Sequence, residues 1–503
     1  MRKTWLHRGI AVMLAAVMLM AGTGCSGTGK TENEEKEPAQ ENHEDGAQGG
    51  LTGTITVGYT SEQEEMYQKL IAKFNEMYPD VEVIPQSIPG TMYGQITKMT
   101  ALAAADNLPD ICIGSEQFGY IMQQGWAYPI ENLLNEDEDC EYVLQSGLER
   151  FSYNGHIFAL PYRVHFNTIA VNEDLLNTLN MDKPDYDWTL DEFISMAKKA
   201  TTNEYSGINY VYNGTNPTWG LDNKLMGALL PDGYEQFGYS FDTHNIDLTV
   251  NNAWVESNNI LNELSSVPGL ISDNLKASSS GSMNDYEKKF GKDADALVSG
   301  KVLFGNHSTW EYATFAKSNF KFDFYPVPTA EGIPQRIQMH VDFCYMTTKV
   351  TEENRQAAWE FLKFISFRKE GCLIRLEDMQ NVSGTKNLEV YVPASADPEV
   401  LAAFDESVYV DGIKYMYHQV VEHPEQTLVA DCDKVVPNFW SDITQYRDTA
   451  VTSVQEGTDP SALVTDLQTK ASEAIANSWQ YFCTSMDKNL ETFYASHPWE
   501  KSN

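Results

Sequence analysis

The chain begins to alternate apolar and polar residues at TITVGY, over 54–59, which predicts a strand. Apolar residues then recur every three or four positions over 64–78, as on the buried face of a helix. The pattern then alternates between strand and helix again. VEVI at 81–84 predicts a second strand, residues 96–103 predict a helix, and LPDICIG at 108–114 predicts a third strand. This β-α-β-α-β order favours a parallel sheet covered by helices, and hence an α/β fold.

Two pairs of residues mark the beginnings of helices. Ser61 precedes Glu64, and Thr189 precedes Glu192, each at the spacing of a capping box, in which the two side chains bind the first free amides of a helix. Alternation returns over 341–347, ahead of another amphipathic helix, and the remaining chain is mostly helical in pattern. Since 503 residues are too many for one core, we expect two lobes or more.

The N-terminal residues predict an export signal. A basic start precedes an unbroken apolar run from Ile10 to Ala21, which is shorter than the roughly 20 residues that span a bilayer. The junction GCSGTGKT also matches a phosphate-binding loop, but the polar stretch after it offers no helix with an apolar face. The context resembles that of bacterial lipoproteins, which implies removal of residues 1–24, a palmitate-bearing lipid anchor on Cys25 and an acidic tether over 25–50. A plainly secreted chain is the alternative.

Charge and cysteine usage exclude several classes of partner. The chain has 72 Asp and Glu against 35 Lys and Arg, a formal charge of −37. Such a surface repels polyanions, so we expect no nucleic-acid partner. The later cysteines show neither C-x-x-C nor zinc-site spacing, and we expect no metal and no cofactor. Cys112 and Cys344 lie in apolar, strand-like runs and are expected to be buried thiols, while any disulfide pairing stays open.

Seven stretches occur in an order that is informative as a whole. LPDICIGSEQFGYIMQQGWAYPIENLL is followed by YNGHIFALPYRVHFNTIAVNEDLL, DWTLDEFISMAKKAT, ALVSGKVLFGNHSTWEYA, FYPVPTAEG, AAWEFLKFI and VPNFWSDITQYRDTAV. Across residues 54–480 this order resembles the extracellular solute-binding proteins of carbohydrate ABC importers, in the branch that includes maltodextrin-binding proteins. The resemblance implies an α/β, two-lobe periplasmic-binding-protein-like fold with a ligand cleft between the lobes.

The same resemblance implies where the lobes divide. Three crossovers are expected, near 161–164, 325–328 and 387–393. They assign 51–162 plus 329–388 to an N-terminal α/β lobe, and 163–328 plus 389–503 to a C-terminal α/β lobe. An insertion around 400–440 has no assigned role.

Candidate ligand-binding residues first follow from strand ends. In open α/β sheets, ligands bind beyond the carboxyl ends of the strands. The loop after the first predicted strand supplies Tyr59, Ser61 and Glu62, and the loop after the third supplies Glu116 and Gln117. Carboxylates and amides of this kind pair with sugar hydroxyls. A solvated surface charge is the alternative for each carboxylate.

Further candidates carry over by motif position. Trp310, Trp440 and Tyr234 match aromatic positions that line the cleft in the resembled family, where ordinary core packing is the alternative. Trp219, in the loop NGTNPTWG, is a fourth aromatic candidate.

Three polar residues complete the predicted site. His165 stands where maltodextrin binders have a carboxylate, which argues against maltodextrin as the ligand. Arg163 and Asp342 lie beside the expected crossovers and either bind ligand or pair as a hinge salt bridge.

The implied function is capture of a sugar or oligosaccharide by lobe closure, without catalysis, and delivery to the permease subunits of an ABC transporter. The implied protein is a monomer on the outer face of the bacterial cytoplasmic membrane, held there only by its lipid anchor. Two alternatives remain. A surface glycoside hydrolase also needs carboxylates beside aromatics, and the same fold could carry a polyamine, a peptide or a metal.

Overall fold

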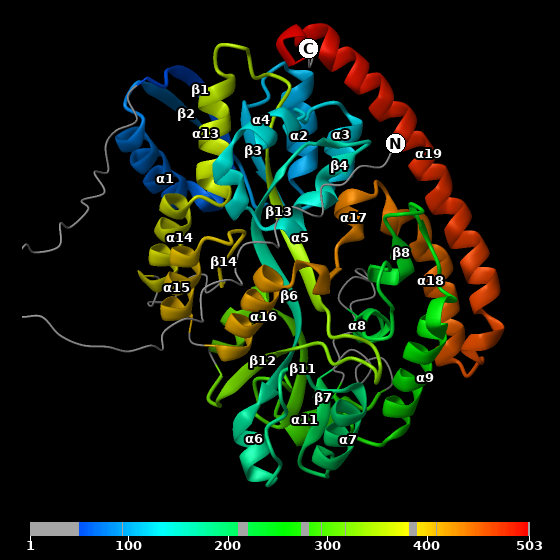
Figure 1. Cartoon of the computed structure of the whole chain (residues 1–503). Coiled ribbons are helices and arrows are strands. Elements are labelled where there is room, and N and C mark those ends of the chain that lie inside the picture. Colours follow the sequence, from blue (N-terminus) through cyan, green and yellow to red (C-terminus); the bar gives the residue numbers. More distant parts are fainter. Residues whose placement is uncertain are drawn as a thin grey trace, which may run out of the picture. The chain divides into compact units, whose positions relative to one another are not determined.

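The computed structural model describes residues 50–500, apart from 93, 210–219, 273–280, 293, 317, 382–389 and 409. The predicted leader, Cys25 and Trp219 lie outside the described residues. All described residues belong to one compact unit, in which long strands run through the middle and helices pack on both sides (Figure 1).

A sheet of mixed direction organises this unit. Among the described residues it has 11 strands, in the main order β10-β7-β11-β6-β13-β3-β1-β2, while β12 and β14 pair with β6 and β15 pairs with β13. The strands are β1 Gly53–Thr60, β2 Val81–Ile88, β3 Ile111–Gly114, β6 Leu160–Asn172, β7 Ser206–Asn209, β10 Ile271–Ser272, β11 Val302–Ser308, β12 Phe322–Pro326, β13 Ile337–Met346, β14 Val392–Pro393 and β15 Thr427–Val429.

The first three strands confirm the predicted β-α-β-α-β unit. β1 is parallel to β2 and to β3, and the helices α1 Glu64–Met77 and α2 Gln95–Ala104 form the connections. The second group, β7, β10 and β11, is parallel as well. We call β1, β2, β3 and their helices the N-half, and β7, β10, β11, β12 and theirs the C-half.

Strand β6 belongs to both halves. Its first part pairs antiparallel with β13, from Leu160 opposite Cys344 to Phe166 opposite Met339. Its last part pairs with β11 on one side and β12 on the other, over 167–172. Because β13 also pairs with β3, β6 and β13 together carry the sheet from one half to the other. The exact lobe boundaries stay a prediction.

The helices cover the sheet and fill the C-terminal third of the chain. They are α3 Phe118–Gln123, α4 Glu131–Glu136, α5 Gln145–Leu148, α6 Glu173–Thr178, α7 Leu190–Ala200, α8 Leu221–Gly227, α9 Ala253–Ser266, α11 Met283–Phe290, α12 Tyr312–Ala316, α13 Arg355–Ser366, α14 Lys369–Asn381, α15 Pro398–Ser407, α16 Asp411–Glu422, α17 Cys432–Val435, α18 Phe439–Gln455 and α19 Val464–Ser496. Two short hairpins lie beside them: β4–β5 (Ser152–Tyr153, His156–Ile157), which we count with the N-half, and β8–β9 (Tyr239–Ser240, Asn245–Ile246), which we count with the C-half.

One predicted capping box is confirmed and the other is wrong. Thr189 accepts from the amide of Glu192, whose carboxylate accepts from the amide of Thr189, so both free amides at the start of α7 are satisfied. Ser61 instead accepts a hydrogen bond from the amide of Gly90 at 3.0 Å. That loop contact, made by a residue distant in sequence, takes the hydroxyl, and α1 starts three residues later, at Glu64.

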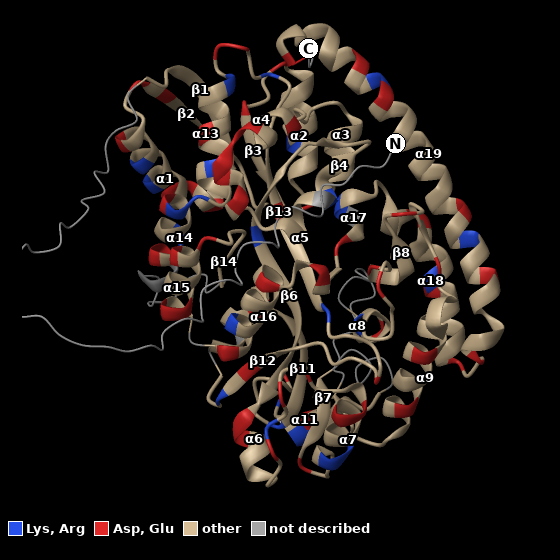
Figure 2. Ribbon diagram, viewed as in Figure 1, with Lys and Arg blue, Asp and Glu red and all other residues tan. Residues whose placement is uncertain are grey.

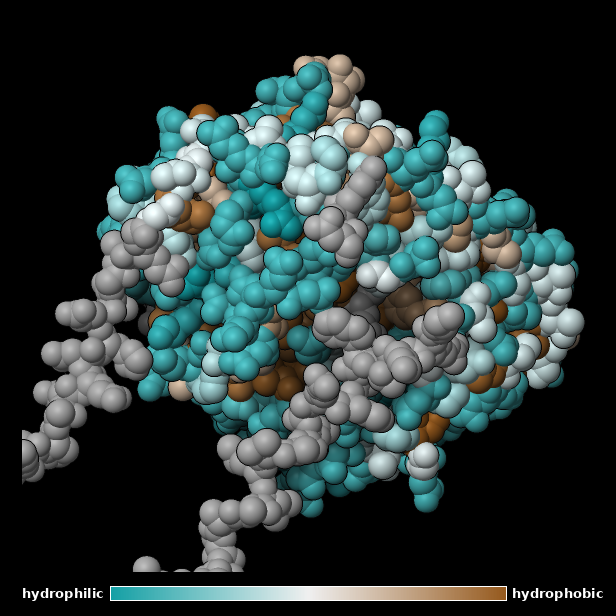
Figure 3. All heavy atoms as spheres, turned by 45° about the horizontal axis from the view of Figure 1, so that its top comes forward, coloured by the Kyte–Doolittle hydropathy of each residue, from teal (hydrophilic) through white to brown (hydrophobic). Residues whose placement is uncertain are grey.

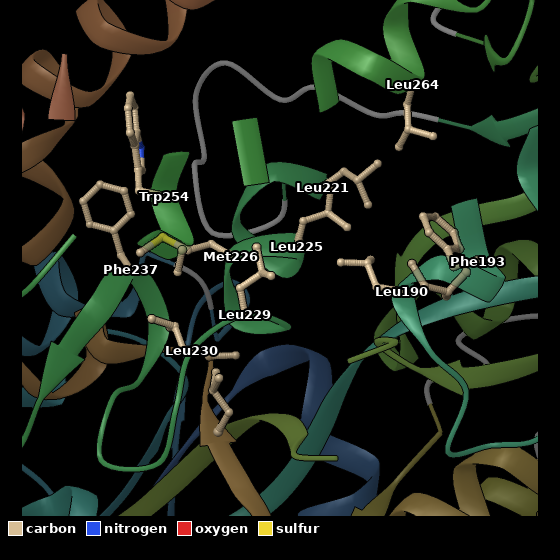
Figure 4. Packing of buried hydrophobic residues seen from close by; sticks show 14 of the residues in the cluster. Leu190, Phe193, Leu221, Leu225, Met226, Leu229, Leu230, Phe237, Trp254 and Leu264 are labelled. Atoms are coloured by element: carbon tan, nitrogen blue, oxygen red, sulfur yellow. The ribbon is translucent and has the colours of Figure 1, made fainter. Parts of the chain in front are cut away.

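Buried apolar residues form three large clusters. The C-terminal cluster packs α7, α8 and α9 against the C-half strands, with Phe193, Leu225 and Trp254 among its members (Figure 4). The N-terminal cluster packs α1 and α13 against the N-half strands, and includes Phe74 and Phe361. The central cluster follows β6 and β13 and takes residues from both halves.

The surface carries the charge that composition predicts. Acidic residues are spread over the outer helices and loops rather than along the strands (Figure 2), and the face in Figure 3 is largely hydrophilic, with hydrophobic residues in small separate patches. Cys112 and Cys344 are buried free thiols, as predicted, and the other four described cysteines are also unpaired. Within the part of the chain that the structure describes, no helix has both the length and the apolarity to cross a membrane.

Candidate functional site

A row of polar side chains occupies the middle of the sheet. Every second residue of β6 and β13 points to the same face, and on one face these residues are polar: Arg163 lies opposite Asp342, and His165 opposite His340. The row continues to Asn167 and Gln338. The side-chain amide nitrogen of Asn167 donates to the side-chain oxygen of Gln338 at 3.4 Å. We call Arg163, His165, Asn167, Gln338, His340 and Asp342 the polar ladder. All but Arg163 are buried.

Hydrogen bonds hold the ladder rigidly. Arg163 Nε donates to Asp342 Oδ2 at 2.6 Å, and His340 Nε2 lies 3.1 Å from Asn167 Oδ1. The same Asn167 oxygen accepts from the hydroxyl of Ser308, at the end of β11. The ladder is therefore tied to the C-half as well as to β13.

A chain of alternating charges extends from the ladder. Asp342 bridges Arg163 and Lys434, at 2.6 and 3.0 Å. Lys434 is also 3.3 Å from Asp431, which in turn is 3.1 Å from Arg150. Three cations thus enclose two carboxylates. Such buried ions need every partner, since the attraction must offset the loss of hydration.

The ladder shifts the pKa values of its members. Burial alone would raise the pKa of Asp342, but the neighbouring Lys434 and Arg163 hold it well below its ordinary value. Burial, helped by Arg163, lowers the pKa of His165 well below 6.5. Burial also lowers the pKa of His340 to about 3, against the opposing effect of Asp431. Both imidazoles are therefore neutral near pH 7.

These neutral histidines make stability depend on pH. Between pH 6.5 and 3, His340 binds a proton in the unfolded chain but not in the folded one, so we expect acidification to lower the free energy of unfolding. The slope is about 1.4 kcal/mol per pH unit for one such histidine. Urea unfolding at pH 7, 6 and 5 measures it, and His340→Asn should flatten the dependence. An equal slope in the variant would contradict a buried neutral His340.

Trp310 lies against the ladder and is partly exposed. The preceding Thr309 accepts a hydrogen bond from the amide of Phe166, on β6, at 3.0 Å. The indole then meets both ladder imidazoles in T-shaped contacts, with ring centroids 5.6 Å from His165 and 5.0 Å from His340. The structure therefore brings together four predicted residues: Trp310, His165, Arg163 and Asp342.

Lys224, on α8, is buried at the C-half end of the ladder. Its ammonium donates to the carbonyls of Thr168 and His307, at 3.1 and 2.6 Å, and burial lowers its pKa to about 7. Its own carbonyl accepts from Gln338 at 3.0 Å. Helix α8 is thus fixed to both β6 and β13.

Three of the predicted N-half residues contact the loop between β2 and α2. Glu62 accepts from the amide of Met92 at 3.0 Å, and Glu116 from the amide of Gly94 at 3.2 Å. The thioether of Met92 in turn accepts from the guanidinium of Arg163 at 3.6 Å. The amide of Gly90, on the same loop, donates to the hydroxyl of Ser61. These contacts together connect the strand-end carboxylates to the ladder.

Tyr59 and Gln117 lie elsewhere in the N-half. Tyr59 is buried in the N-terminal cluster, where its ring stacks on Tyr67 at 4.7 Å and its hydroxyl donates to Glu64. Gln117 is exposed and begins α3 with a left-handed backbone, at φ 55°. Neither position brings the side chain into the contacts described above.

Trp440 and Tyr234 belong to the C-half. The indole of Trp440 meets Phe237 and Phe439 at 5.6 and 5.0 Å, and Tyr234 packs, partly buried, on the same C-terminal cluster. The indole N–H of Trp440 is buried without a partner in the described part of the chain. So are His165 Nδ1 and Gln236 Oε1. Buried polar atoms in native proteins are nearly always satisfied, so these atoms are suited to a polar ligand.

Sequence reasoning missed half of the ladder. Asn167, Gln338 and His340 were detectable, because polar residues alternate with apolar ones in RVHFN and QMHVD, and alternation inside a buried strand marks one polar face. Lys434 and Asp431 gave no such signal, since their role depends on α17 packing beside β13. In the described residues, no group of His, Cys, Asp and Glu is arranged to hold a metal ion.

Comparison with known proteins identifies similar chains. The family model of the bacterial extracellular solute-binding protein matches residues 59–370. Among curated proteins no significant match is found.

Solved structures resemble this one at low sequence identity. MalE, the sugar-binding protein of Xanthomonas citri, has a TM-score of 0.63 at 15% identity, over 86% of this chain and 99% of that one. The sugar transporter RHE_PF00321 of Rhizobium etli, in an open conformation, has a TM-score of 0.61 at 15% identity, over 84% and 99%. The ABC substrate-binding protein Lmo0181 of Listeria monocytogenes, in complex with cycloalternan, has a TM-score of 0.58 at 17% identity, over 85% and 100%. The likeness confirms the predicted two-lobe α/β fold.

Proposed function

The chain belongs to the bacterial extracellular solute-binding proteins, and from that premise we propose that it binds a sugar or oligosaccharide for an ABC importer without altering it. Similar proteins have been solved with cycloalternan and with maltotriose. Closure of the two lobes around the ligand would then present it to permease subunits in the membrane.

The polar ladder under Trp310 carries this proposal. A sugar presents hydroxyls, which both donate and accept, and flat C–H faces, which pack on aromatic rings. Two neutral imidazoles beside an indole suit such a ligand, and His165 Nδ1 is buried without a partner among the described residues. We propose that Arg163 and Asp342 lie at the base of the binding site and that the indole of Trp310 stacks on a face of the sugar.

The two halves supply the remaining proposed contacts. From the N-half come Tyr59, Ser61, Glu62, Glu116 and Gln117, of which Glu62 and Glu116 are positioned by the loop that ends at Gly94. From the C-half come Tyr234 and Trp440, and Trp219 is proposed from the sequence alone. A ligand that touches both halves stabilises the closed state, because only that state makes all the contacts.

The charges around the proposed site do not single out a polyamine. The charge chain has three cations for two carboxylates, while Glu62 and Glu116 add two carboxylates on the N-half side. A direct comparison of a saccharide with spermidine therefore distinguishes a neutral from a cationic ligand.

Two carboxylates beside Trp310 and the ladder argue against hydrolysis there. A glycosidase needs a carboxylic acid whose pKa is raised toward neutrality. Asp342 has its pKa held well below the ordinary value by Lys434 and Arg163 despite its burial. Glu311, next to Trp310, likewise has a lowered pKa, because its ion pair with His307 outweighs burial. Both carboxylates suit binding, and neither suits proton donation.

The location follows from the predicted leader. We propose that residues 1–24 are removed and that lipidated Cys25 holds a monomer to the outer face of the cytoplasmic membrane, with no nucleic-acid partner. Residues 25–50 then act as the tether. Mass spectrometry of the membrane-bound protein would detect the acylated N-terminal cysteine.

Binding is tested with the chain lacking its predicted leader. Thermal shift against a glycan panel should single out one saccharide class, because a ligand at a hundredfold excess over its Kd stabilises by about 2.7 kcal/mol. Calorimetric titration then compares that saccharide with spermidine. Heat from spermidine alone, or sustained turnover of the saccharide, would overturn the proposal.

A further inference from the structure

Helix α19 extends along one side of the unit from the C-half to the N-half (Figure 1). It has 33 residues, and at 1.5 Å per residue it is about 50 Å long. Its buried residues enter all three hydrophobic clusters in turn. Leu467, Ala471 and Ile475 belong to the C-terminal cluster, Phe482 and Met486 to the central one, and Phe493 to the N-terminal one.

The first part of α19 is bound to the C-half. Gln468 donates to the carbonyl of Ile246, at 2.9 Å, and accepts from the amide of Leu248. Ser472 donates to the same carbonyl at 3.2 Å. Six residues further on, Ser478 donates to Asp442, on α18.

The middle of α19 is where the helix passes between the halves. The ring of Trp479 stacks on His244, in the turn of hairpin β8–β9, at 4.0 Å and 16°. Tyr153, in hairpin β4–β5, contacts the same segment: its hydroxyl donates to the carbonyl of Cys483 and to Asp487. A C-half hairpin and an N-half hairpin thus hold neighbouring turns of one helix.

The last part of α19 is bound to the N-half. Asn489 donates to the carbonyls of Met122 and Gln123, at the end of α3, at 3.1 and 2.8 Å. Phe493 meets Tyr128 in a T-shaped contact, with ring centroids 4.8 Å apart. This end is therefore held by hydrogen bonds and by aromatic packing.

The residues after α19 fasten it once more. Glu500, only 3% exposed, forms an ion pair with Arg355, on α13. It also accepts hydrogen bonds from Tyr128 and Asn132. Burial would raise the pKa of Glu500, yet Arg355 and Tyr128 lower it. A buried carboxylate held by three side chains is a fixed attachment point.

We infer that α19 is a brace that limits how far the two halves open. A helix transmits force along its axis, and each of its ends is held by buried apolar residues and by hydrogen bonds to a different half. The halves can rotate apart only if α19 bends or if one set of end contacts breaks. The strands β6 and β13 permit the motion, and α19 sets its range.

The brace is tested by weakening the helix at exposed positions in its middle. Asn477 and Gln480 are exposed and lie on either side of Ser478 and Trp479. Asn477→Gly with Gln480→Gly weakens the helix there, because glycine is a poor helix former, whereas alanine at both positions strengthens it. The alanine pair is therefore the matched control.

Small-angle X-ray scattering of the ligand-free protein gives the result without any assumption about ligand. A compact body of this size has a radius of gyration of about 22 Å, and we expect the glycine pair to raise it by roughly 1 Å. The alanine pair should leave it unchanged. Scattering curves that coincide for both pairs would overturn the inference.

A second variant addresses the far attachment. Glu500→Gln weakens the ion pair with Arg355. The control is Glu491→Gln, at an exposed position on α19. We expect faster amide exchange over 486–496 and a larger radius in Glu500→Gln only. Faster exchange with an unchanged radius would overturn the inference. Because no ligand is used, failure here is distinct from failure to bind a sugar.

Discussion

Replacing Asp342 with alanine is expected to lower the free energy of unfolding by about 3–5 kcal/mol. The change removes the carboxylate that bridges Arg163 and Lys434. Both cations have side chains no more than 15% exposed, so water cannot replace the lost partner. Asp342→Asn keeps the shape and one acceptor, and should cost less.

Urea unfolding at pH 7 measures this loss. Asp80, exposed and in a turn, offers a matched acidic control, since Asp80→Ala should change the free energy of unfolding by no more than about 0.5 kcal/mol. If Asp342→Ala were as stable as Asp80→Ala, the charge chain would be unimportant for the fold.

Replacing Trp310 with alanine is expected to weaken ligand binding by about 30-fold or more, which corresponds to about 2 kcal/mol. The expectation rests on the proposed function, in which the partly exposed indole stacks on a sugar face. Its T-shaped contacts with His165 and His340 hold the ring in one orientation before ligand arrives. Little ordering is therefore left to oppose binding.

Calorimetric titration with the saccharide found by thermal shift gives the two Kd values. Trp310→Phe keeps an aromatic face and should lose less than tenfold. Unfolding of each ligand-free variant shows whether the fold is intact. An unchanged Kd in a folded Trp310→Ala protein would remove Trp310 from the site.

The sequence predicted the elements well where a local pattern decides them. The strands β1, β2 and β3 and the capping box at Thr189 depend on neighbours within a few residues, and all are present. The box predicted at Ser61 failed because Gly90, from a separate loop, binds the hydroxyl. The spacing of residues within one segment does not predict a hydrogen bond from a distant loop.

The candidate site was predictable only in part, for the same reason. Arg163 and Asp342 were predicted either to bind ligand or to pair as a hinge salt bridge, and they form an ion pair with each other. Lys434 donates to Asp342, and Asp431 accepts from the amide of Val341, from a segment some ninety positions later in the chain. Their contribution depends on tertiary packing, which no periodicity encodes.

The buried attachment of Glu500 has a consequence for how the chain is made. Synthesis proceeds from the N-terminus, so β1, β2 and α13 exist long before residue 500 leaves the ribosome. Until then Arg355 lacks its carboxylate partner Glu500, and the N-half lacks this ion pair although its strands have been made. The attachment of α19 to the N-half through Glu500 can therefore form only after residue 500 has been made.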